Sequence, residues 1–399
     1  MSQSSLTQQS FSLREVILQP VLAIGAGMGG MGLALSALPL ALQAFWSLSP
    51  ATIGWIMGAQ SVATLLSRLY AGRLSDRIGG GRALTLGLGA ASLSALCYLL
   101  ALLPFWPLKA ALSLILFGRL LMGLSEGLMV TGGAARILGA VPSDKVGAGM
   151  SWLGLAMFVG LALGTMMGTF IDQNNGFGAV AVVAIVLPVV GMFLSGWPAR
   201  AQRHGAAHAP APWGRLFRTA LPAGVLLTLS SVGFAAISSF LVLTFEQKQW
   251  GHGGYALAAF CAGHVMARFF GGNHIDRHSL QLSGTVMLLA ETLGFLMLWL
   301  APVPEVAMVG AFVSGAGFSL TYPLFAIPLA RSVAPAFIGS AIGLYDMFFD
   351  AALGVGSIAG GLLARCFAMQ VVFLMAALCS GAGLLVLALN ARYRWLKTA

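Results

Sequence analysis

The chain has 399 residues, of which 58% are hydrophobic and only 8% are charged. Soluble domains carry about 25% charged residues, so this composition disfavours a soluble enzyme, a nucleic-acid-binding protein and a disordered protein, and indicates an integral membrane protein. The formal net charge of +10 is explained by basic residues retained on one side of a bilayer, without a nucleic-acid partner.

Charged residues, prolines and glycine clusters divide the chain into twelve apolar segments. Each is close to or above the ~20 residues that a helix needs to cross the hydrocarbon core, and an α-helix satisfies its own backbone hydrogen bonds in lipid. The sequence therefore predicts an all-α membrane protein with twelve transmembrane helices, at residues 16–45, 51–74, 83–104, 108–138, 147–170, 178–197, 219–245, 254–275, 280–301, 305–330, 336–365 and 370–390.

One hydrophilic stretch, residues 199–218, separates the sixth segment from the seventh. It is rich in arginine, histidine and proline, and it contains no apolar run long enough to cross a membrane. We interpret it as a linker between an N-terminal half at residues 1–198 and a C-terminal half at residues 219–399.

The basic residues predict the orientation of the chain. With twelve spans, both termini and the linker lie on one side, which receives 15 of the 21 Lys and Arg residues. Three lie within spans, and three (Lys109, Lys248 and Arg365) fall on the other side. The positive-inside bias therefore places both termini in the cytoplasm.

An internal repeat supports the division into halves. Residues 68–77 (RLYAGRLSDR) align without gaps with residues 268–277 (RFFGGNHIDR). Both copies end the second helix of a six-helix half, as expected for two parallel halves related by an axis along the membrane normal. The residues that recur are Arg68, Gly72, Asp76 and Arg77, which align with Arg268, Gly272, Asp276 and Arg277.

The first copy, continued to Arg82, resembles the signature between helices 2 and 3 of the major facilitator superfamily, and the resemblance covers the whole chain. It implies two six-helix halves that rock about a central cavity, with the repeated motifs acting as a cytoplasmic latch. Gly72 would permit close helix approach, Asp76 would accept hydrogen bonds from basic groups, and Arg77 and Arg82 favour the cytoplasmic side. The alternative is an ordinary basic loop.

The fourth helix carries Arg119, Gly123 and Glu126 at steps of four and three, which place them on one face. The Arg-x-x-x-Gly part resembles a pattern in the same helix of the superfamily. Charged groups within a span are costly unless they face a polar cavity or a partner. We expect Glu126 to take part in proton coupling and Arg119 to hold a carboxylate or an anionic substrate. A buried structural ion pair is the alternative.

Asp346 and Asp350 lie one turn apart in the eleventh helix, with Asp350 close to the middle of the span. Two carboxylates at this depth are hard to explain as lipid-facing residues. Asp350 is therefore the candidate for proton coupling in the C-terminal half, as Glu126 is in the N-terminal half. Asp346 is equally well explained as a partner for the cytoplasmic loops.

Helix 5 has Gly160, Gly164 and Gly168 at strides of four. This pattern resembles the antiporter motif of the drug and proton exchange branch of the superfamily, but it lacks the proline that usually accompanies the motif. Small residues at this spacing also form close-packing helix seams. The pattern favours proton antiport and leaves proton symport open.

Further polar residues are candidates for lining a substrate cavity: Gln60, Thr64, Tyr322 and Tyr345. Gln60 and Thr64 form a polar stripe on helix 2, and the stretch 60–76 is similar to sugar-efflux-like exporters and shares a short piece with opine-metallophore exporters. His264 and Glu291 stand alone within spans, and we interpret both as structural residues.

Two enzyme-like patterns occur in the wrong context. Residues 25–30 fit a dinucleotide fingerprint, but they lie in a membrane span with no acidic residue between Glu15 and Asp76 to hold a ribose. Ser125 fits a nucleophile-elbow string, yet no strand precedes it. The four cysteines lack metal-binding spacing. We therefore expect no enzyme activity, no cofactor and no metal site.

The sequence thus predicts a secondary transporter, most simply a proton-coupled exporter of a small organic molecule. Import by proton symport uses the same architecture, and a non-transporting receptor or scaffold is the remaining alternative. We expect a monomer in the bacterial inner membrane.

Overall fold

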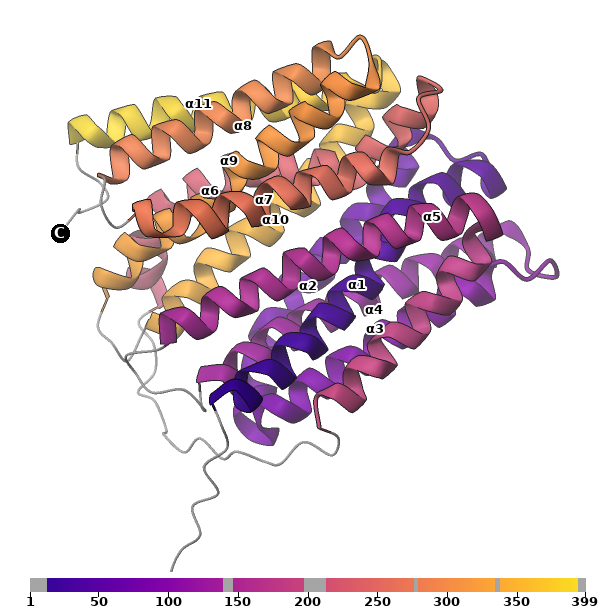
Figure 1. The fold of residues 1–399 in the computed structure, drawn as a ribbon, viewed down its shortest axis with the longest axis horizontal. Helices are drawn as coiled ribbons and strands as arrows, with labels where there is room; N and C mark the ends of the chain where they lie inside the picture. The colour runs from indigo at the N-terminus through magenta and orange to yellow at the C-terminus, as the bar shows by residue number, and fades with distance from the viewer. Residues whose placement is uncertain (1–12, 139–145, 197–212, 276–278, 334–337, 394–399) are drawn as a thin grey trace, which may run out of the picture.

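The computed structural model describes residues 13–138, 146–196, 213–275, 279–333 and 338–393, and these form a bundle of long helices (Figure 1). The first half contains α1 (Leu13–Trp46), α2 (Pro50–Ile78), α3 (Gly80–Ala101), α4 (Leu108–Leu138) and α5 (Val146–Leu194). The second half contains α6 (Trp213–Gln247), α7 (Gly253–Ile275), α8 (Leu280–Leu300), α9 (Pro304–Arg331), α10 (Ile338–Cys366) and α11 (Val371–Tyr393).

The helix α5 is two membrane spans joined by a sharp break. At Gly176 the backbone has φ 76° and ψ 171°, which is not helical. A positive φ is strained for residues with a Cβ, so glycine suits this turn. Counting α5 as two spans gives twelve within the described residues, which confirms the predicted helix number and the all-α membrane class.

The helix α6 begins earlier than the sequence predicts. Residues 213–218 were assigned to the linker because they include Arg215 and Arg218, but they form the first turns of this helix. Both arginines are exposed while Leu216 is buried. The helix therefore extends past its apolar part with a polar outer face, and residues 197–212 lie outside the described part of the chain.

Two helices differ from the others in apolar character. Within the described residues, nine helices are long and apolar enough to cross a membrane, and α2 and α7 are the two that fall outside this set. Each is the second helix of its half, and each packs against the opposite half: α2 on α10, and α7 on α5. These helices tolerate polar residues because part of their surface faces protein instead of lipid.

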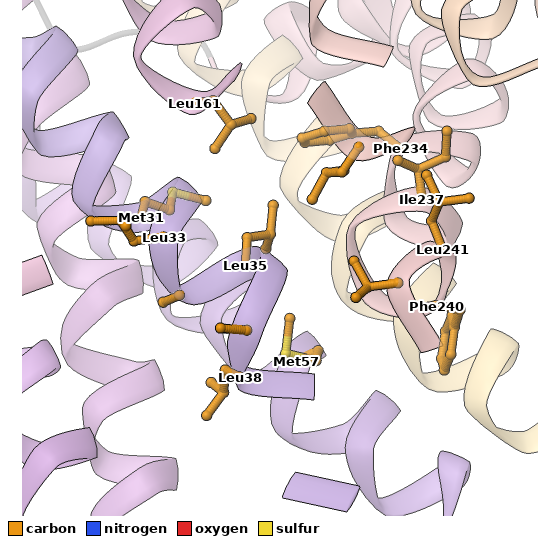
Figure 2. Packing of buried hydrophobic residues seen from close by; sticks show 14 of the residues in the cluster. Met31, Leu33, Leu35, Leu38, Met57, Leu161, Phe234, Ile237, Phe240 and Leu241 are labelled. Atoms are coloured by element: carbon orange, nitrogen blue, oxygen red, sulfur yellow. The ribbon is translucent and has the colours of Figure 1, made fainter. Parts of the chain in front are cut away.

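A continuous apolar core joins the two halves. Figure 2 shows residues of α1, α2 and α5, such as Leu35 and Met57, in one cluster with Phe240 and Leu241 of α6. A second, smaller cluster lies within the C-terminal half. The halves are therefore packed against each other by apolar side chains as well as by the polar contacts of α2 and α7.

Close contacts between the halves occur near the starts of α2 and α7. A Cβ on Gly58 would lie 3.0 Å from the Gly354 carbonyl oxygen of α10, and one on Gly254 would overlap the Thr169 side chain of α5. By the predicted topology this is the outer end of the bundle. The halves therefore pack closely at these two places near that end.

Candidate coupling site between the two halves

Arg68 of α2 reaches across to the opposite half of the bundle. Its guanidinium donates two hydrogen bonds to the Asp350 carboxylate of α10, one from Nε to Oδ2 and one from Nη2 to Oδ1 at 3.2 Å. Its Nη1 donates to Oδ2 of Asp346 at 3.2 Å. Asp346 and Asp350 are one helical turn apart, so a single cation binds both carboxylates. This two-pronged geometry is the one that arginine forms best with a carboxylate.

The cluster of Arg68, Asp346 and Asp350 is largely removed from solvent. The exposed fractions of the three side chains are 12%, 19% and 2%. When both acids are ionised the cluster carries one excess negative charge, and a buried uncompensated charge is costly. The arrangement is therefore suited to take up one proton.

Two tyrosines support this cluster. The Tyr322 hydroxyl of α9 donates a hydrogen bond to Oδ1 of Asp346. The Tyr345 hydroxyl donates to the Tyr322 carbonyl oxygen at 2.9 Å, and Tyr345 is fully buried in the core of the C-terminal half. Tyr345 therefore does not line a cavity in this structure, because its ring fills the core behind Tyr322.

Glu126 of α4 is held by the same helix that carries Arg68. Its Oε2 accepts hydrogen bonds from Gln60 Nε2 at 3.0 Å and from Thr64 Oγ1 at 3.1 Å. Gln60, Thr64 and Arg68 follow one another at steps of four, so they share one face of α2. This face binds the candidate carboxylates of both halves.

Arg119 contacts the backbone of α2 and no carboxylate of the described residues, and its predicted role toward an anionic substrate stays a prediction. It is buried, and its Nη2 donates to the Met57 carbonyl oxygen of α2 at 3.0 Å. Within the described residues it forms no ion pair with a carboxylate. The reason is the close approach of α4 to α2 at Gly123, where a Cβ would lie 2.8 Å from the Thr64 backbone nitrogen. Arg119 therefore meets the backbone of α2.

The comparisons with known proteins agree with this architecture. A model of the Major Facilitator Superfamily matches residues 21–277. An uncharacterized MFS-type transporter of Salmonella typhimurium is 32% identical over 363 residues, which cover 91% of this chain and 93% of that protein. An uncharacterized MFS-type transporter of Burkholderia mallei is 32% identical over 356 residues, with 88% and 86% covered.

The chain belongs to the Major Facilitator Superfamily. It is therefore a multi-pass membrane protein and a secondary transporter, and it is not an enzyme. Among solved structures, the inward-open xylose transporter XylE from E. coli superimposes with a TM-score of 0.78 at 12% identity, over 96% of both chains. This likeness concerns the fold.

The superfamily loop motif is only partly described. Gly72 is not at a close helix contact, since no described atom lies within 4 Å of the position of its Cβ. Arg77 and Arg82 are exposed. For Asp76, which lies in the last turn of α2, and for Gly272, only the backbone is described. Asp276 and Arg277 lie outside the described residues. The latch role of both acids remains a prediction.

The glycine seam of helix 5 packs this helix on α1. A Cβ on Gly160 or Gly164 would overlap the carbonyl oxygen of Gly25 or Gly29. A Cβ on Gly168 would lie 2.7 Å from the Leu33 carbonyl oxygen. The seam thus brings two backbones of the N-terminal half together, which is the close-packing role that small residues have in membranes.

Glu291 lies apart from the cross-half cluster. It is fully buried in the C-terminal half, where the Ser230 hydroxyl donates to it at 2.5 Å. Its Oε2 is buried and has no hydrogen-bond partner in the part of the chain that the structure describes, and a structural role for Glu291 stays a prediction. Within the described residues, no group of three or more His, Cys, Asp or Glu side chains is arranged to hold a metal ion.

A cavity of about 420 Å³ lies at the predicted outer end, between α1 and α5 of one half and α6 and α7 of the other. Asp172 and Glu246 line it, and Gln173 Nε2 is 3.2 Å from Nδ1 of His252 across the halves. Thr169 and Gly254, which form the close contact between α5 and α7, also line it.

The contribution of Arg68 to this site was missed from the sequence, which assigned it to the loop motif. One signal was available: Arg68 lies inside a predicted span and two acids lie inside another, so each needs a partner. The sequence does not predict that α2 packs on α10, and this packing brings Arg68 to the two acids.

Proposed function

We propose that this chain is a proton-coupled transporter that exports a small organic molecule across the bacterial inner membrane, acting as a monomer by alternating access. The observation that carries the proposal is the ion-pair cluster in which Arg68 of one half binds Asp346 and Asp350 of the other. The cluster lies across the interface that must open and close when two halves rock.

Protonation of Asp350 supplies the coupling step. The ionised carboxylate holds Arg68 by charge-assisted hydrogen bonds, and this attraction is strong because the cluster is shielded from water. A neutral carboxylic acid loses most of that attraction, so the contact between α2 and α10 weakens. A proton therefore has different affinities for the two arrangements of the halves, which is the requirement for driving one into the other.

Glu126 is the second coupling candidate. Glu126 lies on α4 and accepts hydrogen bonds from Gln60 and Thr64 of α2. These two donors lie two turns and one turn before Arg68 on the same face of α2. Protonation of Glu126 or of Asp350 therefore changes hydrogen bonds that are made by the same face of α2. Arg119 is assigned a structural role, because it binds the backbone of α2.

Export by antiport is favoured over import by the resemblance of Gly160, Gly164 and Gly168 to the antiporter motif. The relatives named above are called MFS-type transporters, which supports transport and leaves the substrate open. The sugar transported by XylE is not transferred to this chain, because 12% identity supports a shared fold alone.

Proteoliposomes with an imposed pH gradient test this proposal. In antiport, an acidic interior drives uptake of the solute, because protons leave as the solute enters. In symport, an acidic exterior drives it. We expect uptake with an acidic interior and its loss with a protonophore. Uptake that is insensitive to the gradient would remove proton coupling, and uptake driven by an acidic exterior would replace antiport with symport.

A further inference from the structure

The two arginines of the internal repeat have different surroundings. Arg68 binds two carboxylates of α10, whereas Arg268, its counterpart in α7, packs its guanidinium against Gly154 of α5. A Cβ at position 154 would overlap this guanidinium. Within the described residues, Arg268 forms no ion pair. A cation at this depth is costly unless an anion or water compensates it.

His264 lies one turn before Arg268 on the same face of α7. Only 3% of it is exposed, and neither ring nitrogen has a hydrogen-bond partner in the part of the chain that the structure describes. Its ring stacks on Phe158 of α5, with the ring centres 3.4 Å apart and the planes at 15°. A buried polar group without a partner costs about 1–3 kcal/mol, so this imidazole is suited to a ligand that hydrogen-bonds it.

Aromatic rings from both halves surround this pair. Phe158 lies 6.3 Å from Phe234 of α6, and His264 lies 5.7 Å from Phe318 of α9, measured between ring centres. Phe349 of α10 lies 6.2 Å from Phe318. Four helices, α5, α6, α9 and α10, therefore contribute flat apolar rings to the surroundings of His264.

We infer that Arg268 and His264 bind the carboxylate of a small aromatic monocarboxylic acid, and that this class of compound is the substrate. The guanidinium donates to the carboxylate, and the neutral imidazole donates one further N–H. A planar apolar body then rests on the surrounding rings. One positive charge matches one carboxylate, which favours a monoanion over a phosphate ester. This inference rests on the proposed transport function.

The site adjoins the coupling cluster. Helix α7, which carries Arg268, packs on α9, which carries Tyr322, and the Tyr322 hydroxyl donates a hydrogen bond to Asp346. Tyr322 and Asp346 thus form a hydrogen-bonded path from α9, the helix packed on α7, to Arg68 in the opposite half. A bound anion at Arg268 is therefore placed to influence the charge state of the cluster beyond Tyr322.

Ligand-induced stabilisation of the purified protein in detergent tests the inference. The probe is benzoate, compared at the same millimolar concentration and ionic strength with benzamide, which has the same shape without the charge. We expect benzoate to raise Tm by at least about 2 °C, because it binds the folded state alone, and benzamide to have no effect. Equal stabilisation by both compounds would overturn the inference.

Variants identify the residues involved. Arg268→Gln should abolish the benzoate shift, Arg268→Lys should reduce it because the two-pronged geometry is lost, and His264→Phe should weaken it. Arg218→Gln, at an exposed position of α6, is the matched control and should leave it intact. Each variant is first required to elute as a monodisperse peak, so that loss of folding is recognised.

Two outcomes contradict the inference. If folded Arg268→Gln protein keeps the wild-type benzoate shift, the carboxylate does not bind there. If neither benzoate nor the larger 2-naphthoate stabilises folded wild-type protein, the site does not bind aromatic acids. Because no gradient is present in this measurement, its failure is distinct from a failure of proton coupling, which the liposome experiment reports.

Discussion

Arg68 in α2 and Asp350 in α10 are joined across the two halves of the molecule by two hydrogen bonds between guanidinium and carboxylate. The same two helices also touch backbone to backbone nearer the outer end, where Gly58 meets Gly354. The contact of α2 with α10 is thus close-packed at one end and held by charge further in. Loss of the charge would release the inner part and leave the outer contact in place.

A double-mutant cycle measures this ion pair. Arg68→Gln leaves two buried carboxylates without their cation, so it should destabilise the protein by roughly 3–5 kcal/mol. Asp350→Asn should be milder, because Arg68 keeps Asp346. The double variant should be less destabilised than the sum of the two, since the residues share one network. Thermal unfolding in detergent gives the three values, and strict additivity would show that the pair is not energetically coupled.

We expect the contact of Gly254 with α5 to keep the predicted outer end closed. The side chain of Gly254→Val would overlap Thr169, so the start of α7 must move away from α5. We expect a cysteine introduced at the buried position Ser36, beside the outer cavity, to react faster with a membrane-impermeant maleimide in this variant. The experiment uses a background without the four native cysteines.

The control for this change is Gly381→Val in α11, where no described atom lies within 4 Å of the added carbon. It should leave the labelling rate unchanged. An unchanged rate in the Gly254→Val protein as well would show that this contact does not close the outer end.

Gly164 is required for the packing of α5 on α1. An added methyl would overlap the Gly29 carbonyl oxygen, so Gly164→Ala should destabilise the protein by about 1–3 kcal/mol. Gly381→Ala, which meets open space, should be neutral or slightly stabilising because alanine is the better helix former. The thermal midpoints of the two variants give the comparison, and equal midpoints would remove the packing role.

The orientation of the chain remains a prediction from its basic residues. A periplasm-active reporter fused after Arg203 should be inactive, and a cytoplasm-active reporter at the same place should be active, because residues 199–218 are rich in arginine. Activity of the periplasmic reporter would reverse the topology. The end of the bundle called outer above would then face the cytoplasm, and the inner end would face the periplasm.

Helix positions followed from the sequence more fully than contacts did. The predicted span 51–74 falls within α2 (Pro50–Ile78), because in lipid the length and apolar content of a segment decide whether it spans. The start of α6 at Trp213 was misplaced. A helix that leaves the membrane continues with polar residues, and composition does not mark that boundary.

For the site residues, the sequence predicted positions within helices but not the partners of the side chains. Glu126 and Asp350 were predicted to be coupling residues because acids are scarce within spans, but the partner of Asp350 is Arg68, which is 282 positions away in the chain. Arg119 and Glu126 share a helix face as predicted, yet Arg119 binds a backbone carbonyl. The helical period predicts which face of α4 carries Arg119. Its partner depends on how closely α2 approaches α4, and Gly123 permits the close approach seen here.

The central claim is that the charge of Asp350 controls the contact between the halves, and a pH-dependent distance measurement tests it without a substrate. Spin labels at the exposed positions Tyr70 of α2 and Ser332 after α9 report the separation in a background lacking the native cysteines. In the wild type the distance should increase as the pH falls. Glu246→Gln, in the outer cavity, is the control and should respond in the same way.

Asp350→Asn imitates the protonated acid, so it should hold the long distance at every pH. If Asp350→Asn protein instead shows the same pH response as the wild type, Asp350 does not couple proton binding to movement of the halves. A response lost in Glu126→Gln and retained in Asp350→Asn would equally contradict the account, and would assign the coupling to Glu126.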